Sequence, residues 1–308
     1  MLKWKSKLVL AAIETKYGAD VSPGGGAAVQ VSDVQLTPMD GTDIVRNLEK
    51  PYLGGDATAP GELHAKLAFK VELSGSGKAG TAPNWGVLLR GCGIAQTVTK
   101  STKVVYNPVS SAHESLSLHV WIDETRYILL GARGSVKFAL TAQAIPQMEF
   151  EFTGPFTVPK QASQVTPNYT GYQTPLVSNS TNTPVFTVKG TAFVMRDFML
   201  DIANAVESRF LIGSESVLIT DRADSLETTV EAKVLTAFDP FTLARDEAQV
   251  PVALKHGVEA GHCLTFNIPK AQIQRLSGLQ STQNIKEWPL KFALLPTAGD
   301  DQWTLTLT

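Results

Sequence analysis

The stretch PFTVPKQASQVTPNYTGYQTPLVSNSTNTP, residues 155–184, divides the chain into two segments of ordinary domain size. Each of its five prolines fixes one backbone angle and removes one amide donor, so no helical or alternating pattern persists through it. Because proline holds the backbone near polyproline II, the composition favours an extended linker over a flexible one. The sequence therefore predicts one module over residues 1–154 and a second over residues 185–308.

The composition limits the classes of function that remain. Of 308 residues, 43% are hydrophobic and 18% charged, so each half can bury a core. A net charge of -2 and a pI near 6.2 give no general attraction for nucleic acid or for an anionic membrane. The apolar run Leu8–Ile13 is too short for a signal sequence, and no stretch approaches a membrane span, so we expect no membrane partner.

The two cysteines, Cys92 and Cys263, fall one in each half. A bridge between them is conceivable, but the sequence favours two free, buried thiols in a reducing cytoplasm.

The first half is predicted to be an antiparallel β domain with one short helix. Residues 65–73 alternate apolar and polar side chains, as a strand with one buried face does. A short helix is expected from Pro83 to Cys92, with Pro83 at its first position. Further strands are expected over residues 116–122, 127–130, 136–140 and 148–152.

The second half repeats this order. The alternating strand around Val230 is followed by a helix over Asp239–Glu247, for which Asp239 is a good N-cap and Pro240 a good first residue. Before that strand, a polar connection passes through Arg209, and after the helix more strands follow. The common order favours duplication of one module; two unrelated β domains are the alternative.

Residues 37–61 are predicted to form a long polar loop with little periodicity. A loop of this length inside a compact domain is usually functional, although a flexible insertion would have the same composition. Its apolar residues favour a surface kept for a partner. These residues are Ile44, Val45, Leu48, Tyr52 and Leu53.

No constellation of residues indicates catalysis, a metal or a cofactor. His113 and His119 lie six residues apart, which fits neither a helical nor a hairpin metal pair well, and the remaining histidines are isolated. The glycine-rich runs lack the strand and helix of a phosphate loop. The sequence therefore predicts a structural or binding protein and not an enzyme.

Three short stretches carry a resemblance to a family. They are IETKYG at residues 13–18, VSDVQLTP at residues 31–38 and TAPNWGVLLR at residues 81–90, and FTVKGT at residues 186–191 looks like the start of a second copy. Together they resemble the tail tube proteins of long-tailed, non-contractile bacteriophages.

This resemblance implies a fold and a function. The expected fold is mainly β: two tandem antiparallel β-sandwich or barrel modules, each with one short helix and long loops. Six modules usually make a ring, so two modules per chain imply homotrimeric rings with pseudo-sixfold symmetry. The rings would stack into a virion tail tube, assembled in the host cytoplasm, through which double-stranded DNA passes at ejection.

The resemblance also implies partners and contact residues. The partners are other copies of the chain, a tape measure protein in the lumen, and tail terminator and distal tail proteins. Ring stacking is assigned to the 37–61 segment, aided by the N-terminal arm, while the linker bridges adjacent modules around the ring. The ring-stacking candidates are Ile44, Arg46, Leu48, Tyr52, Leu53 and Arg209.

Two alternatives remain open at this point. A related tail component (a terminator, distal or baseplate hub protein) would share the fold and would cap a tube without extending it. A two-domain carbohydrate-binding tail module is the other alternative, for which only Tyr169 and Tyr172 in the linker offer support.

Overall fold

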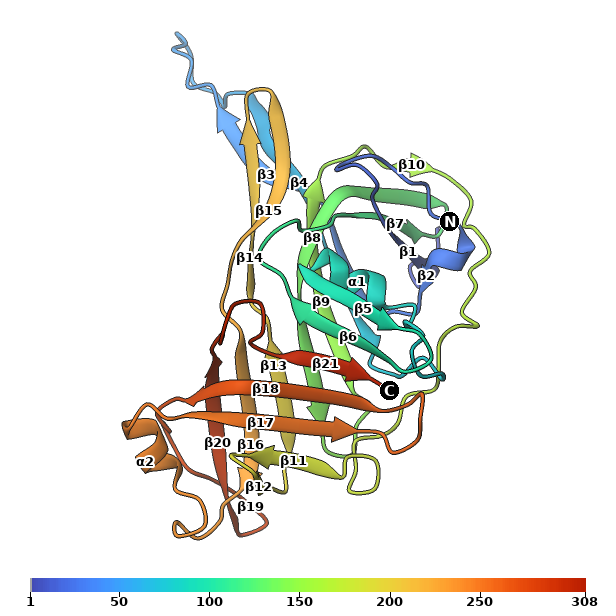
Figure 1. Ribbon diagram of the computed structural model, residues 1–308. Helices are drawn as coiled ribbons and strands as arrows, with labels where there is room; N and C mark the ends of the chain where they lie inside the picture. Colours follow the sequence, from blue (N-terminus) through green and yellow to red (C-terminus); the bar gives the residue numbers. More distant parts are fainter. Residues whose placement is uncertain (1) are drawn as a thin grey trace.

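The structure is a computed structural model that describes residues 2–308 (Figure 1). It is mainly β, with antiparallel strand pairing throughout and two α-helices of six residues each, as the sequence predicts. The strands form two packed layers, which is the arrangement of a β-sandwich.

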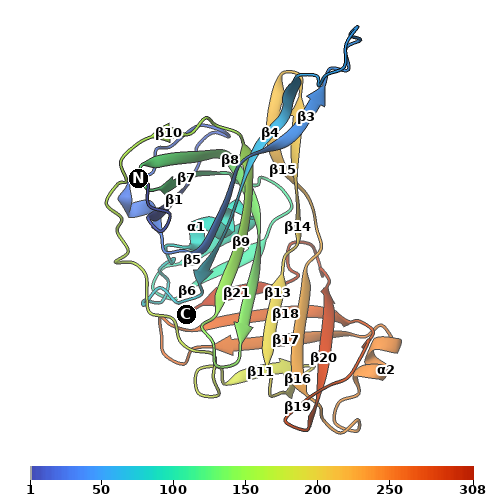
Figure 2. The ribbon, with the colours of Figure 1, turned by 180° about the vertical axis from the view of Figure 1, so that it is seen from behind.

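One layer is a long curved sheet that runs through both halves of the chain, here called the shared sheet (Figure 2). Its strands pair in the following order: β3 (Ser32–Val45), β4 (Thr58–Glu72), β9 (Gln147–Pro155), β8 (Thr125–Thr141), β13 (Asp197–Asp201), β16 (Ser225–Glu231), β20 (Ile285–Leu294), and then the end of β18 (Leu264–Ile273) with β19 (Gln280–Thr282).

The other layer consists of two groups of strands. The first group is β2 (Ala28–Val29), β1 (Lys7–Ile13), β7 (Leu116–Ile122), the beginning of β8, and β10 (Lys160–Gln161). The second group is β12 (Thr191–Ala192), β11 (Val185–Val188), β17 (Gln249–His256), the beginning of β18, β21 (Thr304–Leu307), β6 (Lys103–Pro108) and β5 (Ile94–Thr99). β8 and β18 therefore belong to both layers.

The helices and one further hairpin complete the fold. The helices are the 3₁₀ turn η1 (Gly25–Ala27), α1 (Gly86–Gly91) and α2 (Pro240–Arg245). β14 (Asn204–Leu211) and β15 (Ser214–Arg222) form a separate hairpin.

The core is continuous between the two halves. Phe138 on β8 is fully buried, and its ring lies 5.3 Å from that of Phe266 and 5.9 Å from that of Trp303. Each such aromatic side chain contributes about 1.5–3 kcal/mol by leaving water. The core thus resists separation of the halves as well as unfolding of either one.

Several predictions for individual elements are confirmed. Asp239 caps α2, since its carboxylate accepts from the amides of Phe241 and Thr242 at 3.0 and 3.1 Å. Cys92 and Cys263 are both free and buried. Residues 155–184 are irregular apart from the ends of β9 and β10.

Other predictions were wrong. Residues 37–61 are not a loop: they form the outer part of a β3–β4 hairpin, and only residues 46–57 connect the two strands. The polar connection through Arg209 is the β14–β15 hairpin. The first helix begins at Gly86, not Pro83, and the two strands expected over residues 127–140 are the single strand β8.

Asp224 is a buried carboxyl group whose pKa is strongly raised. It lies almost completely buried between β15 and β16, and the indole Nε1 of Trp303 donates to its Oδ1 at 3.0 Å. Loss of hydration raises the pKa of Asp224 from 3.8 to about 6, although the hydrogen bond from Trp303 opposes the rise.

We predict that Asp224→Asn stabilises the protein at neutral pH. The raised pKa makes the protonated form favourable in the folded state, so this stabilisation is present below pH 4 and is lost as the pH rises through about 6. The loss is at most about 3 kcal/mol, and asparagine, which keeps the acceptor for Trp303, avoids it. Denaturant unfolding between pH 4 and 8 should show a free energy of unfolding that declines with pH for the wild type but not for the variant. An equal dependence of this free energy on pH in both proteins would contradict the prediction.

Candidate assembly surfaces

The two halves of the chain have the same strand pairing. Every pairing within the first half has a counterpart in the second, apart from those of the β5–β6 hairpin. The corresponding pairs are β1–β2 with β11–β12, β1–β7 with β11–β17, β7–β8 with β17–β18, β8–β9 with β18–β20 and β19–β20, β4–β9 with β16–β20, β3–β4 with β13–β16, and β8–β10 with β18–β21.

A shared irregularity aligns the halves residue by residue. The β7–β8 ladder shifts register between Leu116 and Leu118, and the β17–β18 ladder shifts between Val250 and Val252. Following the pairing outward from these bulges makes Gln35–Thr37 of β3 equivalent to Met199–Asp201 of β13. Counting back along both strands makes Asp33 and Val34 equivalent to Asp197 and Phe198, across a register shift that only β3 has. It likewise places residues 278–282, at β19, at the position of residues 137–141 of β8. The division at residues 154 and 185 is not tested by this pairing and stays a prediction.

The two halves are joined by a strand pair, which we call the joint. β8 and β13 pair antiparallel over five residues, from Asp197 opposite Thr141 to Asp201 opposite Lys137. On the core side, Phe198 and Leu200 are fully buried beside Leu140 and Phe138. The joint continues the shared sheet from one module into the next without a break.

The ends of the shared sheet are unpaired. Within residues 2–308, β3 pairs with β4 alone and β19 pairs with β20 alone. By the alignment, the outer edge of β3 corresponds to the β13 side of the joint, and the outer edge of β19 to the β8 side. The two open edges of the shared sheet, at β3 and β19, are therefore equivalent to the two strands that pair in the joint, β13 and β8. Unpaired edges of this kind favour pairing with another strand.

Two hairpins project from the same end of the molecule (Figure 1). They lie side by side, with the rings of His64 on β4 and Phe210 on β14 6.3 Å apart. The β3–β4 hairpin reaches further and carries the connecting segment 46–57.

The structure brings most of the predicted stacking residues together at this tip. Ile44 is near the end of β3, and Arg46, Leu48, Tyr52 and Leu53 lie in the connecting segment. All five are exposed, and Leu53 is completely so. Arg209 is exposed on β14, opposite Ser216, and so belongs to the neighbouring hairpin. Their role in stacking stays a prediction.

Sequence reasoning missed a second apolar tip. Leu211 and Ile212 end the β14–β15 hairpin and are both exposed, Ile212 completely. Gly213, with φ of 91°, makes the turn, and this glycine between two alternating runs was the available signal.

The base of the β14–β15 hairpin is held by polar contacts to the first half. The amide of Asn204 donates to the carbonyls of Cys92 and Gly134 at 2.7 and 2.9 Å, and its Oδ1 accepts from Arg222 at 3.1 Å. Arg222 also donates to the carbonyl of Gly93 at 3.0 Å. These bonds orient the hairpin relative to the module against which it lies.

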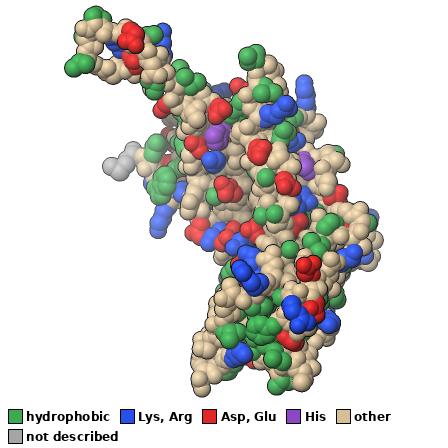
Figure 3. All heavy atoms as spheres, turned by 90° about the vertical axis from the view of Figure 1, so that its left-hand side faces the viewer, with side chains coloured by type: hydrophobic (Ala, Val, Ile, Leu, Met, Phe, Trp, Pro, Cys, Tyr) green, Lys and Arg blue, Asp and Glu red, His purple; other side chains and the backbone are tan. Residues whose placement is uncertain are grey.

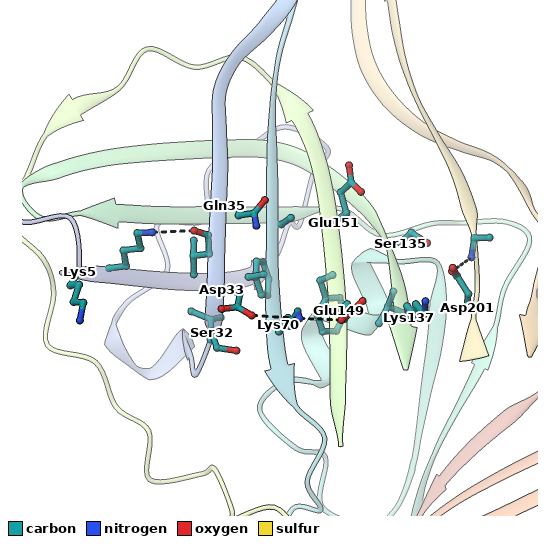
Figure 4. A pocket seen from close by; sticks show the side chains of 18 of the residues that line it. Lys5, Ser32, Asp33, Gln35, Lys70, Ser135, Lys137, Glu149, Glu151 and Asp201 are labelled. Carbon is teal, nitrogen blue, oxygen red and sulfur yellow. Dashed lines mark hydrogen bonds and ion pairs between the residues drawn. The ribbon is translucent and has the colours of Figure 1, made fainter. Parts of the chain in front are cut away.

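The outer face of the shared sheet is polar and charged. It carries an open hollow of about 1140 Å³ that extends from β3 across to β13 (Figure 4). In one row across the strands, Lys70 Nζ lies 3.5 Å from Asp33 and 3.3 Å from Glu149. Lys137 and Asp201 continue the row across the joint. The contact with Glu149, followed by that with Asp33, raises the pKa of Lys70.

Acidic side chains outnumber basic ones on this face. The strand register and the ion pairs place the following acidic residues on it: Asp33, Glu149, Glu151, Asp197, Asp201, Glu227, Glu231 and Glu287. The basic residues are Lys5 and Lys7 at the border of the hollow, and Lys66, Lys70, Lys137, Arg196 and Lys291. The surplus makes the surface mildly repulsive to phosphate.

The titratable groups elsewhere have structural partners. His119 lies 2.8 Å from Asp20, and burial lowers the pKa of its imidazole; His256 contacts Thr183 at 2.9 Å. The buried carboxylate of Glu14 accepts from Ser115, Ser117 and two backbone amides. In the described part of the chain, no group of three or more His, Cys, Asp or Glu side chains could hold a metal ion. Neither helix in residues 2–308 has the length and apolar character needed to cross a bilayer.

Comparison with known proteins identifies no family. No protein-family model matches the sequence, and a search of curated proteins finds no match.

We predict that Asn204→Ala destabilises the fold by roughly 2 kcal/mol, because it removes the side-chain donor to the carbonyls of Cys92 and Gly134 and one of the three acceptors of Arg222. Chemical denaturation would measure this. Glu207→Ala, which removes an exposed side chain from the same strand, is the matched control and should change stability by less than about 0.5 kcal/mol. Equal effects of the two substitutions would contradict the role given to Asn204.

Proposed function

We propose that this protein is the major tail tube subunit of a long-tailed, non-contractile bacteriophage: a structural protein, not an enzyme, that closes into rings and stacks them into a tube. The observation that carries the proposal is the joint. The chain already contains one contact of this kind between its two halves, and its two unpaired edges would form a second one between chains.

The register of the contact between chains follows from the alignment. Asp33–Thr37 of one chain would pair antiparallel with residues 278–282 of the next, as Asp197–Asp201 pairs with residues 137–141. In this register Val34 lies opposite Ser281. Val34 has no register partner in β4, and its carbonyl already accepts an external donor, Lys7 Nζ at 3.1 Å. Ser281 alternates with Gln280 and Thr282 in a two-residue hairpin, so its amide is on the outer side.

Repeating one rotation closes a ring. Each chain would contribute the eight strands of the shared sheet, and three chains would make a barrel of 24 strands. The charged outer face of the shared sheet would then line the lumen, where its acidic surplus limits adhesion of passing DNA. The core face would pack against the second layer, as it does within one chain.

The projecting hairpins suit contacts along the tube axis. They extend the shared sheet beyond one end of the molecule and expose apolar side chains there (Figure 1). A tip that enters the next ring would bury them. The resemblance supplies the remaining expectations: a tape measure protein in the lumen, terminator and distal tail proteins at the ends, and a location in the virion.

We predict that Val34→Pro and Ser281→Pro each abolish ring closure. Proline removes the amide that the second strand would bind. Light scattering after size exclusion should give three 33.1 kDa chains, about 99 kDa, or multiples of this, for the wild type and single chains for either variant.

Mixing the two variants is the internal control. Each retains the edge that the other lacks, so the mixture should form pairs, about 66 kDa, and no rings. Unchanged circular dichroism would establish that both variants fold. Rings formed by either variant alone would overturn the proposed joint.

We predict that deleting residues 44–56 stops tube growth but not ring closure. The deletion removes the apolar tip, and Asp43 and Pro60 remain paired with a three-residue connection between them. Electron microscopy should show single rings for the variant and tubes for the wild type. Tubes of normal length from the variant would contradict the assignment of stacking to the tip, and a wild type that forms only single rings would indicate a capping component.

A further inference from the structure

The segment before β1 exposes apolar side chains. Leu2 and Trp4 are 62% and 71% exposed, whereas the other four tryptophans of the chain are buried. Exposed tryptophan at a fixed position favours contact with a partner.

This segment, residues 2–6, is held in place. The backbone amide of Lys3 donates to Asp123 at 2.8 Å, and the side-chain amide of Gln164 donates to the carbonyl of Ser6 at 3.1 Å. Trp4 therefore has a defined position even though its ring is exposed.

That position is beside the unpaired edge of β3. Lys7 Nζ lies 4.1 Å from the centre of the Trp4 ring and donates to the carbonyl of Val34. Trp4 and Lys5 also border the hollow that begins at β3 (Figure 4). Because a carbonyl oxygen has two lone pairs, Val34 can accept from Lys7 and from a strand amide together.

The repeat shows where such a segment lies relative to a joint. β1 corresponds to β11, so residues 2–6 correspond to the end of the linker. Directly before the equivalent residues, 179–183, Ser178 exchanges two backbone hydrogen bonds with the β8–β9 turn, donating to Ala144 at 2.9 Å and accepting from Gln143 at 2.8 Å. The segment before β11, in the second half, thus contacts the β8–β9 turn of the first half. The first half is the one to which the second half is joined through β8 and β13.

We propose that residues 2–6 of one chain cover the β19–β20 turn of the neighbouring chain, where Leu2 and Trp4 pack against Leu279 and Ile285. The turn residues are Gln283 and Asn284, both at positive φ, and Leu279 and Ile285 are exposed on either side of them. Ile285 occupies the position that Ile145 has in the first module. Figure 3 shows the side of the molecule on the left of Figure 1, with hydrophobic side chains gathered at its lower end. The occupant is a second copy of this chain.

This contact rests on the proposed ring and adds a second contact between neighbouring chains of that ring. A joint of five residue pairs between chains lacks the covalent linker that supports the joint within a chain. The leading segment would supply that support and act within a ring, not between stacked rings.

Thiol cross-linking of co-expressed chains tests the contact. One chain carries Leu2→Cys and the other Ile285→Cys, and a short bismaleimide is added; a second pair, Gln35→Cys with Gln280→Cys, probes the joint. Each cysteine chain alone is the control for Cys92 and Cys263. Two-chain products from both pairs are expected. A product from the Gln35–Gln280 pair alone would overturn this inference and leave the ring standing, and products from neither pair would overturn both.

Substitution provides a second measurement. Leu2→Ser with Trp4→Ser should raise the concentration at which half of the rings dissociate by about tenfold or more, since two apolar side chains lose their cover. Leu2→Met with Trp4→Phe keeps the apolar surface and should change it by less than about threefold. Equal dissociation of the two double variants would overturn the inference.

Discussion

The structure depends on the requirement that strand edges be hydrogen bonded. A strand whose outer amides and carbonyls have no partner invites further pairing, and most folds close or cover such edges. This chain covers one pair of edges internally, at β8 and β13, and leaves the equivalent pair at β3 and β19 open. Because the two halves of the chain have the same strand pairing, the closed joint gives a register for the open edges in the proposed ring.

Both layers of the fold connect the two halves of the chain. The shared sheet crosses from one half to the other at β8–β13, and the second layer crosses at β6–β21. Between these crossings, Phe138 packs against Phe266 and Trp303. Because strands pair across the two halves in both layers, the halves cannot rotate freely relative to each other. A closed ring needs the same rotation at each step. The inserted β5–β6 hairpin, which has no counterpart in the second half, thus supplies a second connection between the halves besides the joint.

The sequence predicted those elements that are decided locally. Strict alternation identified the buried strands, and the Asp239–Pro240 pair identified the start of α2, because both depend on neighbouring residues. The β3–β4 hairpin was missed because its ladder shifts register three times, which destroys the alternation. β8 was divided because Gly131, with φ of 61°, interrupts the pattern where the strand passes between layers.

Of the candidate surfaces, only the apolar tip could be read from the sequence. Apolar residues in a polar segment indicate a contact surface whatever the secondary structure of that segment. Leu48, Tyr52 and Leu53 were therefore identified as exposed, although the segment around them was predicted to be a loop and not a hairpin. The open edges depend on which strands lack partners, and pairing of residues as distant as Lys137 and Asp201 leaves no local trace. The charged row from Asp33 to Asp201 likewise exists only once five strands are in register.

The two modules are similar but not identical, and the difference has a consequence for a stacked assembly. Six equal hairpins would allow one ring to sit on the next in any of six equivalent orientations. Here the β3–β4 hairpin carries a long apolar tip, whereas β14–β15, the hairpin between the corresponding strands β13 and β16, ends in a short turn at Ile212 and Gly213. A ring of three chains would therefore present three long and three short tips in alternation. If each long tip enters only one of the two kinds of module in the next ring, the number of permitted orientations falls from six to three.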